Sequence, residues 1–229
     1  MTNGGNRLYF GDNLEILRKD VAGGKQIGDE SVDLIYLDPP FNSNASYNIL
    51  FREKSGEQSA AQIAAFEDTW HWSLESAGVY RDLVVNGPRK LADLLEALVR
   101  FLGHNDMMAY LVMMAARLVE LRRVLKPTGS VYLHCDTSAC HYLKLLMDAI
   151  FGVENYRNQI TWKRTTAHSD AKQGRKAFGN ITDILLFYTR CGGVGSYTFN
   201  HQHATTTRSM WTRSIPILTR MGGGMGCGT

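Results

Sequence analysis

The sequence predicts an α/β fold built on a mostly parallel sheet, and three observations support this prediction. First, Val32–Leu37 is an apolar run rich in β-branched and aromatic residues, which is typical of a buried strand. Second, strand and helix patterns alternate along the chain: strands over 7–10, 130–136, 159–164 and 183–189, and helices over 13–19, 91–125 and 141–151. Third, several connections are short, as in strand–helix–strand units of parallel sheets.

The helices have recognisable beginnings and ends. Asp12 precedes the first helix and Glu15 follows three residues later, which is the spacing of a capping box. The segment 106–125 carries Ala, Met and Leu on several faces, so we expect a largely buried helix whose methionines fill the core. Lys126–Gly129 contains a proline and a glycine, which end that helix.

Residues 42–90 are patterned less regularly than the rest. They begin with a cluster of Asn and Ser and contain the aromatic segment Phe66–Trp72. A long insertion directly after a strand end suits a lid or substrate loop, and it equally suits a surface excursion anchored by its tryptophans. Both interpretations stay open.

Composition excludes several classes of protein. The chain has 229 residues and is 44% hydrophobic, which is enough for one sizeable domain. It has neither a run of 18 apolar residues nor an apolar segment at its N-terminus. Its four cysteines lack the spacing of a disulfide framework. We therefore expect a cytoplasmic protein without a membrane partner.

The charge is distributed unevenly. The net charge is +3, yet the segment from Arg157 onward has ten basic and two acidic residues and a net charge of +8, while the preceding part carries −5. A basic C-terminal third favours a surface that faces a polyanion. Charge alone would fit a solvated surface just as well.

The most informative motif is Asp38-Pro39-Pro40-Phe41, which follows the strand Val32–Leu37 directly. Proline fixes φ and restricts the residue before it, so the loop is stiff. The Asp38 carboxylate and the Pro39 carbonyl are hydrogen-bond acceptors, and Phe41 can stack on a base that has left the duplex. Taken alone, Asp-Pro-Pro would be an ordinary turn at the end of a strand.

This set of groups suits the activation of an exocyclic amino nitrogen. The lone pair of such a nitrogen is delocalised into the base, which makes it a poor nucleophile. Two acceptors that bind its N–H groups draw it toward tetrahedral geometry and localise the lone pair. A rigid loop helps, because small displacements of reacting atoms cost large rate factors.

Four segments together resemble the β-type amino DNA methyltransferases, the adenine-N6/cytosine-N4 group that includes the modification subunits of type III restriction systems. The matching segments are Leu8–Leu17, Ser31–Asn42, Leu125–Phe151 and Asn158–Arg164. The resemblance implies a Rossmann-like methyltransferase fold with helices on both faces of the sheet. It also implies S-adenosylmethionine as methyl donor, a flipped base of double-stranded DNA as acceptor, adenine more than cytosine, and a restriction subunit or a dimer partner.

The resemblance also implies roles for individual residues. Asp38, Pro39, Pro40 and Phe41 align with the catalytic motif of the family. The residues expected at the cofactor are Asp12, Asn13 and Asp38. The residues expected to contact nucleic acid are Trp162, Lys163, Arg164, Lys172, Arg175 and Lys176. Transfer is direct from the sulfonium to nitrogen, so no catalytic cysteine is expected.

The C-terminal part departs from the family pattern. The family has a Gly-rich cofactor loop that opens a helix after the catalytic part, and the glycine run 222–228 has no room for one. We therefore expect residues 1–200 to be a partial catalytic domain, incomplete on its C-terminal side, with 42–90 as the lid or substrate-loop insertion. We also expect weak or absent activity of this chain alone. Residues 201–229 contain no acidic residue and no clear periodicity, and we hypothesise that this tail is frameshifted.

Rival interpretations remain. The chain could be a non-catalytic DNA-binding fragment, or a methyltransferase acting on RNA or on a protein amide, because an amide nitrogen poses the same lone-pair problem. A zinc site would need His134, Cys135, Cys140 and His141, but the first two point to opposite sides of a strand and the spacing is not that of a structural site. We therefore expect no metal.

Overall fold

A computed structural model describes residues 5–40, 46–48, 64–67, 70–163, 181–191 and 196–200. The chain divides into two compact units, 1–198 and 199–229, and every element below belongs to the first. The helices are α1 Asn13–Arg18, α2 Leu74–Asn86, α3 Arg89–Leu102, α4 Asp106–Val124, α5 Cys140–Phe151 and the 3-10 turn η1 Val153–Asn155. The strands are β1 Asp20–Val21, β2 Gly24–Lys25, β3 Val32–Leu37, β4 Ser46–Asn48, β5 Ala64–Glu67, β6 Leu125–Cys135, β7 Tyr156–Lys163 and β8 Thr182–Thr189.

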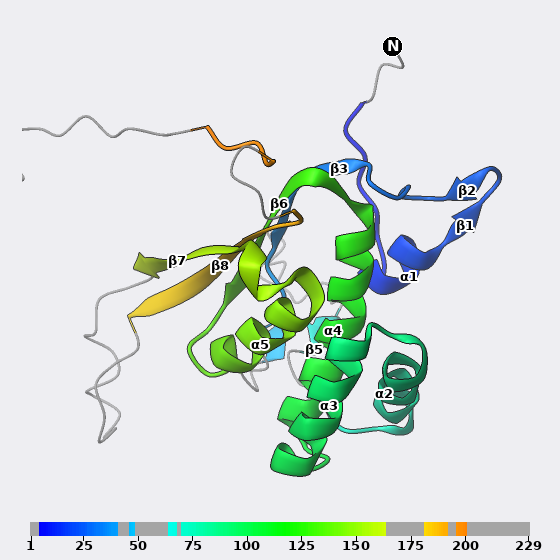
Figure 1. Cartoon of the computed structure of the whole chain (residues 1–229). Helices are drawn as coiled ribbons and strands as arrows, with labels where there is room; N and C mark the ends of the chain where they lie inside the picture. Colours follow the sequence, from blue (N-terminus) through cyan, green and yellow to red (C-terminus); the bar gives the residue numbers. More distant parts are fainter. Residues whose placement is uncertain are drawn as a thin grey trace, which may run out of the picture. The chain divides into compact units, whose positions relative to one another are not determined.

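The central sheet has the strand order β3-β6-β8-β7 (Figure 1). β3 and β6 are parallel, with Leu37 opposite Leu133, and β8 is antiparallel to both β6 and β7. Three of the four strands therefore point in one direction. The carboxyl ends of β3, β6 and β7 consequently lie at the same edge as the amino end of β8, and we call this the carboxyl edge.

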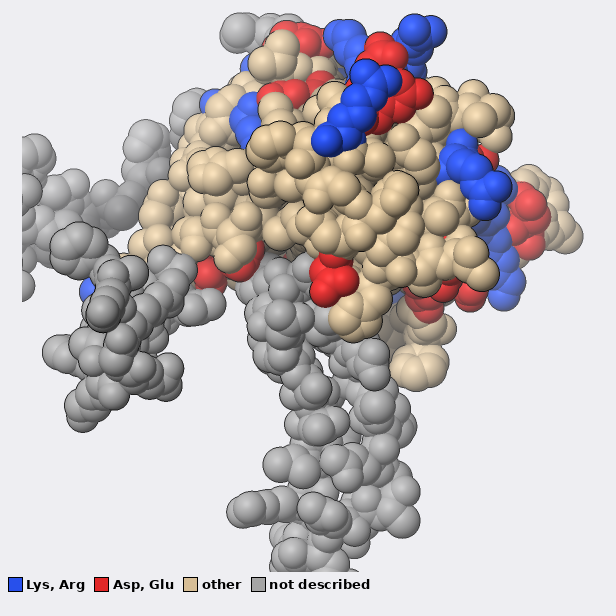
Figure 2. Space-filling model, turned by 90° about the horizontal axis from the view of Figure 1, so that it is seen from below, with Lys and Arg blue, Asp and Glu red and all other residues tan. Residues whose placement is uncertain are grey.

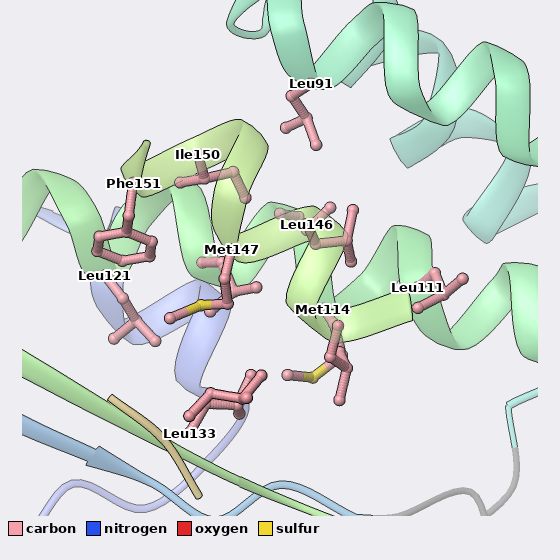
Figure 3. Close-up of a cluster of buried hydrophobic side chains, with 14 of the residues drawn as sticks. Leu91, Leu111, Met114, Leu121, Leu133, Leu146, Met147, Ile150 and Phe151 are labelled. Atoms are coloured by element: carbon pink, nitrogen blue, oxygen red, sulfur yellow. The ribbon is translucent and has the colours of Figure 1, made fainter. Parts of the chain in front are cut away.

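The hydrophobic core lies on one face of the sheet, between its strands and the helices. Figure 3 shows side chains of α4 and α5 pointing toward one another, with Leu133 of β6 beneath them. Leu133, Leu146 and Met147 are fully buried. The largely apolar α4 is buried on several faces, as its composition predicts, and its methionines Met108 and Met114 are in the core cluster.

The second face of the sheet is more open. Side chains alternate along β3, so Leu34 and Tyr36 point away from Ile35 and the helices, and both are more than half exposed. Among the described residues the helices pack on the first face, so the predicted helices on the second face are not seen in this part of the chain. None of the helices described has the length and apolar character of a membrane span.

Most of the predicted elements are confirmed, including α1, β3, α4, α5, β7 and β8, with boundaries that differ by a few residues. The predicted strand over 7–10 is wrong, because these residues have no regular structure and Leu8 and Phe10 are almost fully exposed. The irregular segment 42–90 contains the regular helix α2. The lid role of this segment stays a prediction, and its residues 49–63 lie outside the described residues.

Helix α2 begins with a capping box. Ser73 Oγ accepts a hydrogen bond from the Ser76 amide at 3.2 Å, and Ser76 Oγ accepts one from the Ser73 amide at 2.8 Å. We expect Ser73→Ala to lower the free energy of unfolding by about 1 kcal/mol, because it leaves one amide of the first turn without its acceptor. Urea unfolding measures this loss. The matched control is Leu74→Ala, since Leu74 is the next residue and is exposed; equal losses in both variants would contradict the prediction.

Candidate active site

Asp38 lies immediately after β3, at the carboxyl edge of the sheet. Its side chain is 61% exposed, so the carboxylate is open to solvent and to a ligand. Pro39, directly after it, is buried and Pro40 is half-buried. The motif therefore has a rigid, packed base that presents one accessible carboxylate. Phe41, the last residue of the motif, lies outside the described residues.

The neighbouring strands bring two more polar side chains to Asp38. His134 Nδ1 lies 2.9 Å from Asp38 Oδ1, and His134 Nε2 lies 3.4 Å from Asp183 Oδ2. This contact follows from the strand register: Leu37 is opposite Leu133, so Asp38 and His134 come next on adjacent parallel strands. Asp183 is in the antiparallel strand β8, whose amino end reaches the same edge.

Sequence reasoning missed His134 and Asp183 as parts of this site. From the sequence, His134 is a candidate only for a zinc site, and Asp183 only for the beginning of a strand. The available signal was a polar residue inside each apolar strand, VYLHC and TDILLF, at an end that a parallel sheet places beside Asp38.

Of the residues predicted to bind nucleic acid, the structure describes Trp162 and Lys163, near the carboxyl end of β7. Trp162 is opposite Asp183 in the β7–β8 register, and its side chain is 61% exposed. Three strand spacings separate β3 from β7, so this indole lies at the same sheet edge as Asp38 but roughly 14 Å across the sheet. The remaining four residues, Arg164, Lys172, Arg175 and Lys176, lie outside the described residues.

The charges of the described residues are largely paired. Figure 2 shows Lys and Arg side chains next to Asp and Glu in several places on the face it displays. A cavity of about 460 Å³ lies at the edge of the sheet opposite Asp38, lined in part by Asp29, Glu30, Arg123 and Arg190. Arg190 pairs with Glu30 at 2.7 Å and Arg123 pairs with Glu120 at 2.7 Å. Arg123 also pairs with Asp29, so the arginines of this cavity link the end of α4 and the end of β8 to the residues just before β3.

Asp12 and Asn13 occupy a second position of interest, where α1 meets α4. Asp12 caps α1 by accepting a hydrogen bond from the Leu14 amide. Arg117 of α4 donates to Asp12 Oδ2 at 2.6 Å, to Asn13 Oδ1 at 2.8 Å and to the Met113 carbonyl at 3.0 Å. Burial lowers the pKa of the Arg117 guanidinium, and the Asp12 carboxylate opposes that shift. Two of the three residues predicted at the cofactor thus have a structural role at the α1–α4 contact.

The same position has features that suit part of a nucleoside. A hollow of about 230 Å³ is lined by Tyr9, Phe10, Asp12 and neighbouring residues. Asp12 is 42% exposed there and can accept further hydrogen bonds, and the Phe10 ring is free to stack. Whole small-molecule sites measure roughly 300–1,000 Å³, so this hollow fits only part of S-adenosylmethionine.

Cys135, the residue that follows His134, has an unreactive thiol. Cys135 points to the opposite face of β6, is fully buried and donates to the Ile184 carbonyl. Burial, with Cys140 and Asp136 nearby, raises the pKa of the Cys135 thiol from 9.0 to about 12. The thiolate is the nucleophilic form of cysteine, so a thiol held neutral in this way does not act as a nucleophile.

The raised pKa of Cys135 predicts a pH dependence of stability. In the unfolded chain this thiol ionises near pH 9, whereas the folded chain keeps its proton up to about pH 12. The folded state binds more protons in that interval, so we expect the free energy of unfolding to fall as pH rises, by at most ~1.4 kcal/mol per pH unit. Urea unfolding above about pH 8.5 measures the slope. Cys135→Ala should reduce it, and an unchanged slope in that variant would contradict the assignment.

Comparison with known proteins identifies the family. The sequence profile of the DNA methylase family matches residues 32–213. The Mod subunit of the type III restriction-modification enzyme StyLTI of Salmonella typhimurium strain LT2 is 28% identical over 191 residues, which are 83% of this chain and 24% of that protein. The type II methyltransferase M.EcaI of Enterobacter cloacae is 34% identical over 185 residues, which are 81% of this chain and 29% of that protein.

The chain thus spans about a quarter of the length of these curated relatives. Among solved structures, the cytosine-N4-specific PvuII DNA methyltransferase overlaps 80% of this chain and 49% of its own, with a TM-score of 0.45 and 12% identity. The family profile covers most of the chain, including β3, Asp38, His134 and Asp183. The predicted resemblance is confirmed, and the chain belongs to the adenine-N6/cytosine-N4 DNA methylase family.

Proposed function

We propose that this chain carries the catalytic part of a DNA methyltransferase that moves a methyl group from S-adenosylmethionine to the exocyclic amino group of a flipped base. The observation that carries the proposal is the accessible Asp38 carboxylate on a rigid Pro-Pro base, at the carboxyl edge of a sheet of this family. In open α/β sheets, ligands bind outside the carboxyl ends of the strands.

The mechanism assigns separate tasks to the residues of this edge. S-adenosylmethionine supplies an electrophilic methyl carbon on a sulfonium. Asp38 accepts a hydrogen bond from one N–H of the target amino group, and the Pro39 carbonyl accepts the other. The nitrogen lone pair would then localise, which makes the amino group a better nucleophile. Asp38, open to solvent, is placed to receive the proton that the methylated nitrogen loses.

Adenine is the base we propose, because the resemblance of the four sequence segments favours it over cytosine. The names of the relatives, a Mod subunit of a restriction-modification enzyme and a type II methyltransferase, support a role in restriction-modification with a restriction subunit as partner. We further propose that Asp12, which lines the hollow beside α1, and its neighbour Asn13 contribute to the donor site, and that Asp38 contributes to it at the carboxyl edge.

A methyl-transfer assay tests the proposal. The purified chain, in excess over substrate, is incubated with methyl-labelled S-adenosylmethionine and double-stranded DNA, and the DNA is digested to nucleosides. We expect weak label in N6-methyladenine, in line with the partial catalytic domain that the sequence predicts. Label in N4-methylcytosine would correct the base, and label only in RNA or protein would redirect the activity. DNA binding without any consumption of the donor would leave the non-catalytic alternative.

Trp162 is proposed to stack on a base near the target. Stacking on an aromatic side chain contributes about 1–3 kcal/mol per base, so we expect Trp162→Ala to weaken DNA binding roughly 5- to 150-fold. Fluorescence anisotropy with a duplex that contains one mismatched pair measures this, because a mismatched base leaves the stack most easily. Trp162→Phe is the matched control and should retain most of the affinity. An alanine variant that binds as tightly as the wild type would contradict the stacking role.

A further inference from the structure

Three polar side chains, carried by three neighbouring strands or the residue that follows one, lie in a row at the carboxyl edge. Asp38 follows β3, His134 belongs to β6 and Asp183 to β8. The Asp38–His134 contact is 2.9 Å and the His134–Asp183 contact is 3.4 Å. Each contact uses a different ring nitrogen, so the imidazole bridges the two carboxylates.

The exposed fraction of these three side chains falls from Asp38 to Asp183. The side chains are 61% exposed at Asp38, 16% at His134 and 5% at Asp183. A buried carboxylate that contacts the far nitrogen of a histidine fixes the orientation of the ring. The near nitrogen is then held in place against the carboxylate that faces solvent.

We propose that His134 is a positioning residue, held by Asp183, that fixes the Asp38 carboxylate for methyl transfer; the inference rests on the proposed function. An exposed aspartate otherwise samples several rotamers. His134 Nδ1 contacts Oδ1 of Asp38, which leaves Oδ2 to accept the N–H of the target amino group. Fixing one oxygen therefore sets the direction of the other.

The adjoining strand residues set this histidine apart from an ordinary core position. Leu133 and Cys135, on either side of it in β6, are fully buried on the helix-covered face. His134 points to the other face, where the neighbouring Tyr132 stacks on Phe187 with ring centroids 4.4 Å apart. On this face the ring nitrogens of His134 contact the two carboxylates named above.

Substitutions at His134 separate positioning from packing. His134→Asn can place an amide N–H near the position of Nδ1 and so can donate to Asp38. His134→Gln reaches instead toward the position of Nε2 and Asp183. His134→Leu removes both nitrogens at similar volume. Single-turnover methyl transfer at saturating donor and DNA gives the rate constant, while calorimetry gives donor affinity and anisotropy gives DNA affinity.

We expect His134→Leu to lower the rate constant about 10²-fold, the effect of a small misplacement of a reacting group, with affinities for donor and DNA unchanged. His134→Asn should recover more of the rate than His134→Gln. A His134→Leu rate equal to that of the wild type, or equal recovery by Asn and Gln, would overturn the proposal.

A second measurement does not depend on activity. The ¹⁵N resonances of the His134 ring should shift in both Asp38→Asn and Asp183→Asn, and should stay in place in Asp33→Asn, whose carboxylate pairs with Lys126 at the other end of β3. If the wild type transfers no methyl group to any acceptor but these shifts occur, the proposed function fails and the His134 bridge stands. If the ring resonances do not shift in Asp38→Asn, the proposed contact between His134 and Asp38 is wrong.

Discussion

Asp38→Asn is expected to lower the rate constant of methyl transfer by about 10²–10³-fold, which is the typical cost of removing one preorganised polar group at a reacting centre. The amide oxygen of asparagine still accepts a hydrogen bond but carries no full charge, so it localises the amino lone pair poorly. The amide also cannot take up the proton that the product loses. Because Asp38 is 61% exposed, its loss should cost little stability.

The same single-turnover assay measures this effect, with urea unfolding as the check on folding. Asp33→Asn is the matched control: Asp33 belongs to the same strand, is exposed, and pairs with Lys126 at 2.8 Å away from the carboxyl edge. A rate in Asp38→Asn within a fewfold of the control would show that the carboxylate does not serve the chemistry. The proposed catalytic role of the Asp-Pro-Pro-Phe motif would then be wrong.

The central part of the fold could be predicted from local sequence. The β-branched run Val32–Leu37 forms β3 because it can pair with β6 and bury Ile35 against the helices. The helix α4 begins at Asp106, where Asn105 accepts a hydrogen bond from the Met108 amide, and its apolar residues are buried all round. Propensity, capping and burial agree at these positions, and such agreement makes a prediction safe.

The predicted strand over 7–10 shows where local pattern is insufficient. Leu8 and Phe10 have the residue types of a strand, but the described residues offer them no partner strand and both side chains are almost fully exposed. β propensity reflects packing against cross-strand neighbours, which a single segment cannot report. At α2 the sequence does not predict the helix that forms, because the aromatic and polar residues near Trp72 give no clear helical pattern. This helix packs on α3 and α4.

The active-site edge was predictable only in part, for a reason of register. The sequence identifies Asp38 because the motif is continuous, with strand, carboxylate and prolines in one stretch. His134 and Asp183 join it only because Leu37 lies opposite Leu133 and Cys135 lies opposite Ile184. A shift of one residue in either pairing would turn these side chains to the other face. Contacts across strands therefore require the structure.

Asp12→Ala is expected to lower the free energy of unfolding by about 2–3 kcal/mol, because it leaves the buried Arg117 guanidinium without its carboxylate partner. Arg117 has a side chain that is only 9% exposed, and Asp12 is its carboxylate partner at 2.6 Å. The change also removes the cap of α1, worth about 1 kcal/mol of that total. Asn13, the Met113 carbonyl and the Trp70 ring, 5.4 Å from the guanidinium, retain part of the charge stabilisation.

A double-mutant cycle separates these contributions and also tests the cofactor prediction at Asp12. Asp12→Asn keeps the cap acceptor and loses the charge, so it should cost less than Asp12→Ala. In the background of Arg117→Met no buried charge is left to compensate, and the cost of Asp12→Asn should fall by about 1–3 kcal/mol, the coupling energy typical of contacting residues. Urea unfolding of the four proteins measures this coupling, and purely additive losses would contradict the Asp12–Arg117 pair.

Calorimetry of S-adenosylmethionine binding to folded Asp12→Asn tests whether Asp12 also contacts the donor. Donor affinity that falls with intact folding supports the carboxylate as a ligand contact, whereas unchanged affinity assigns Asp12 to the α1–α4 contact alone.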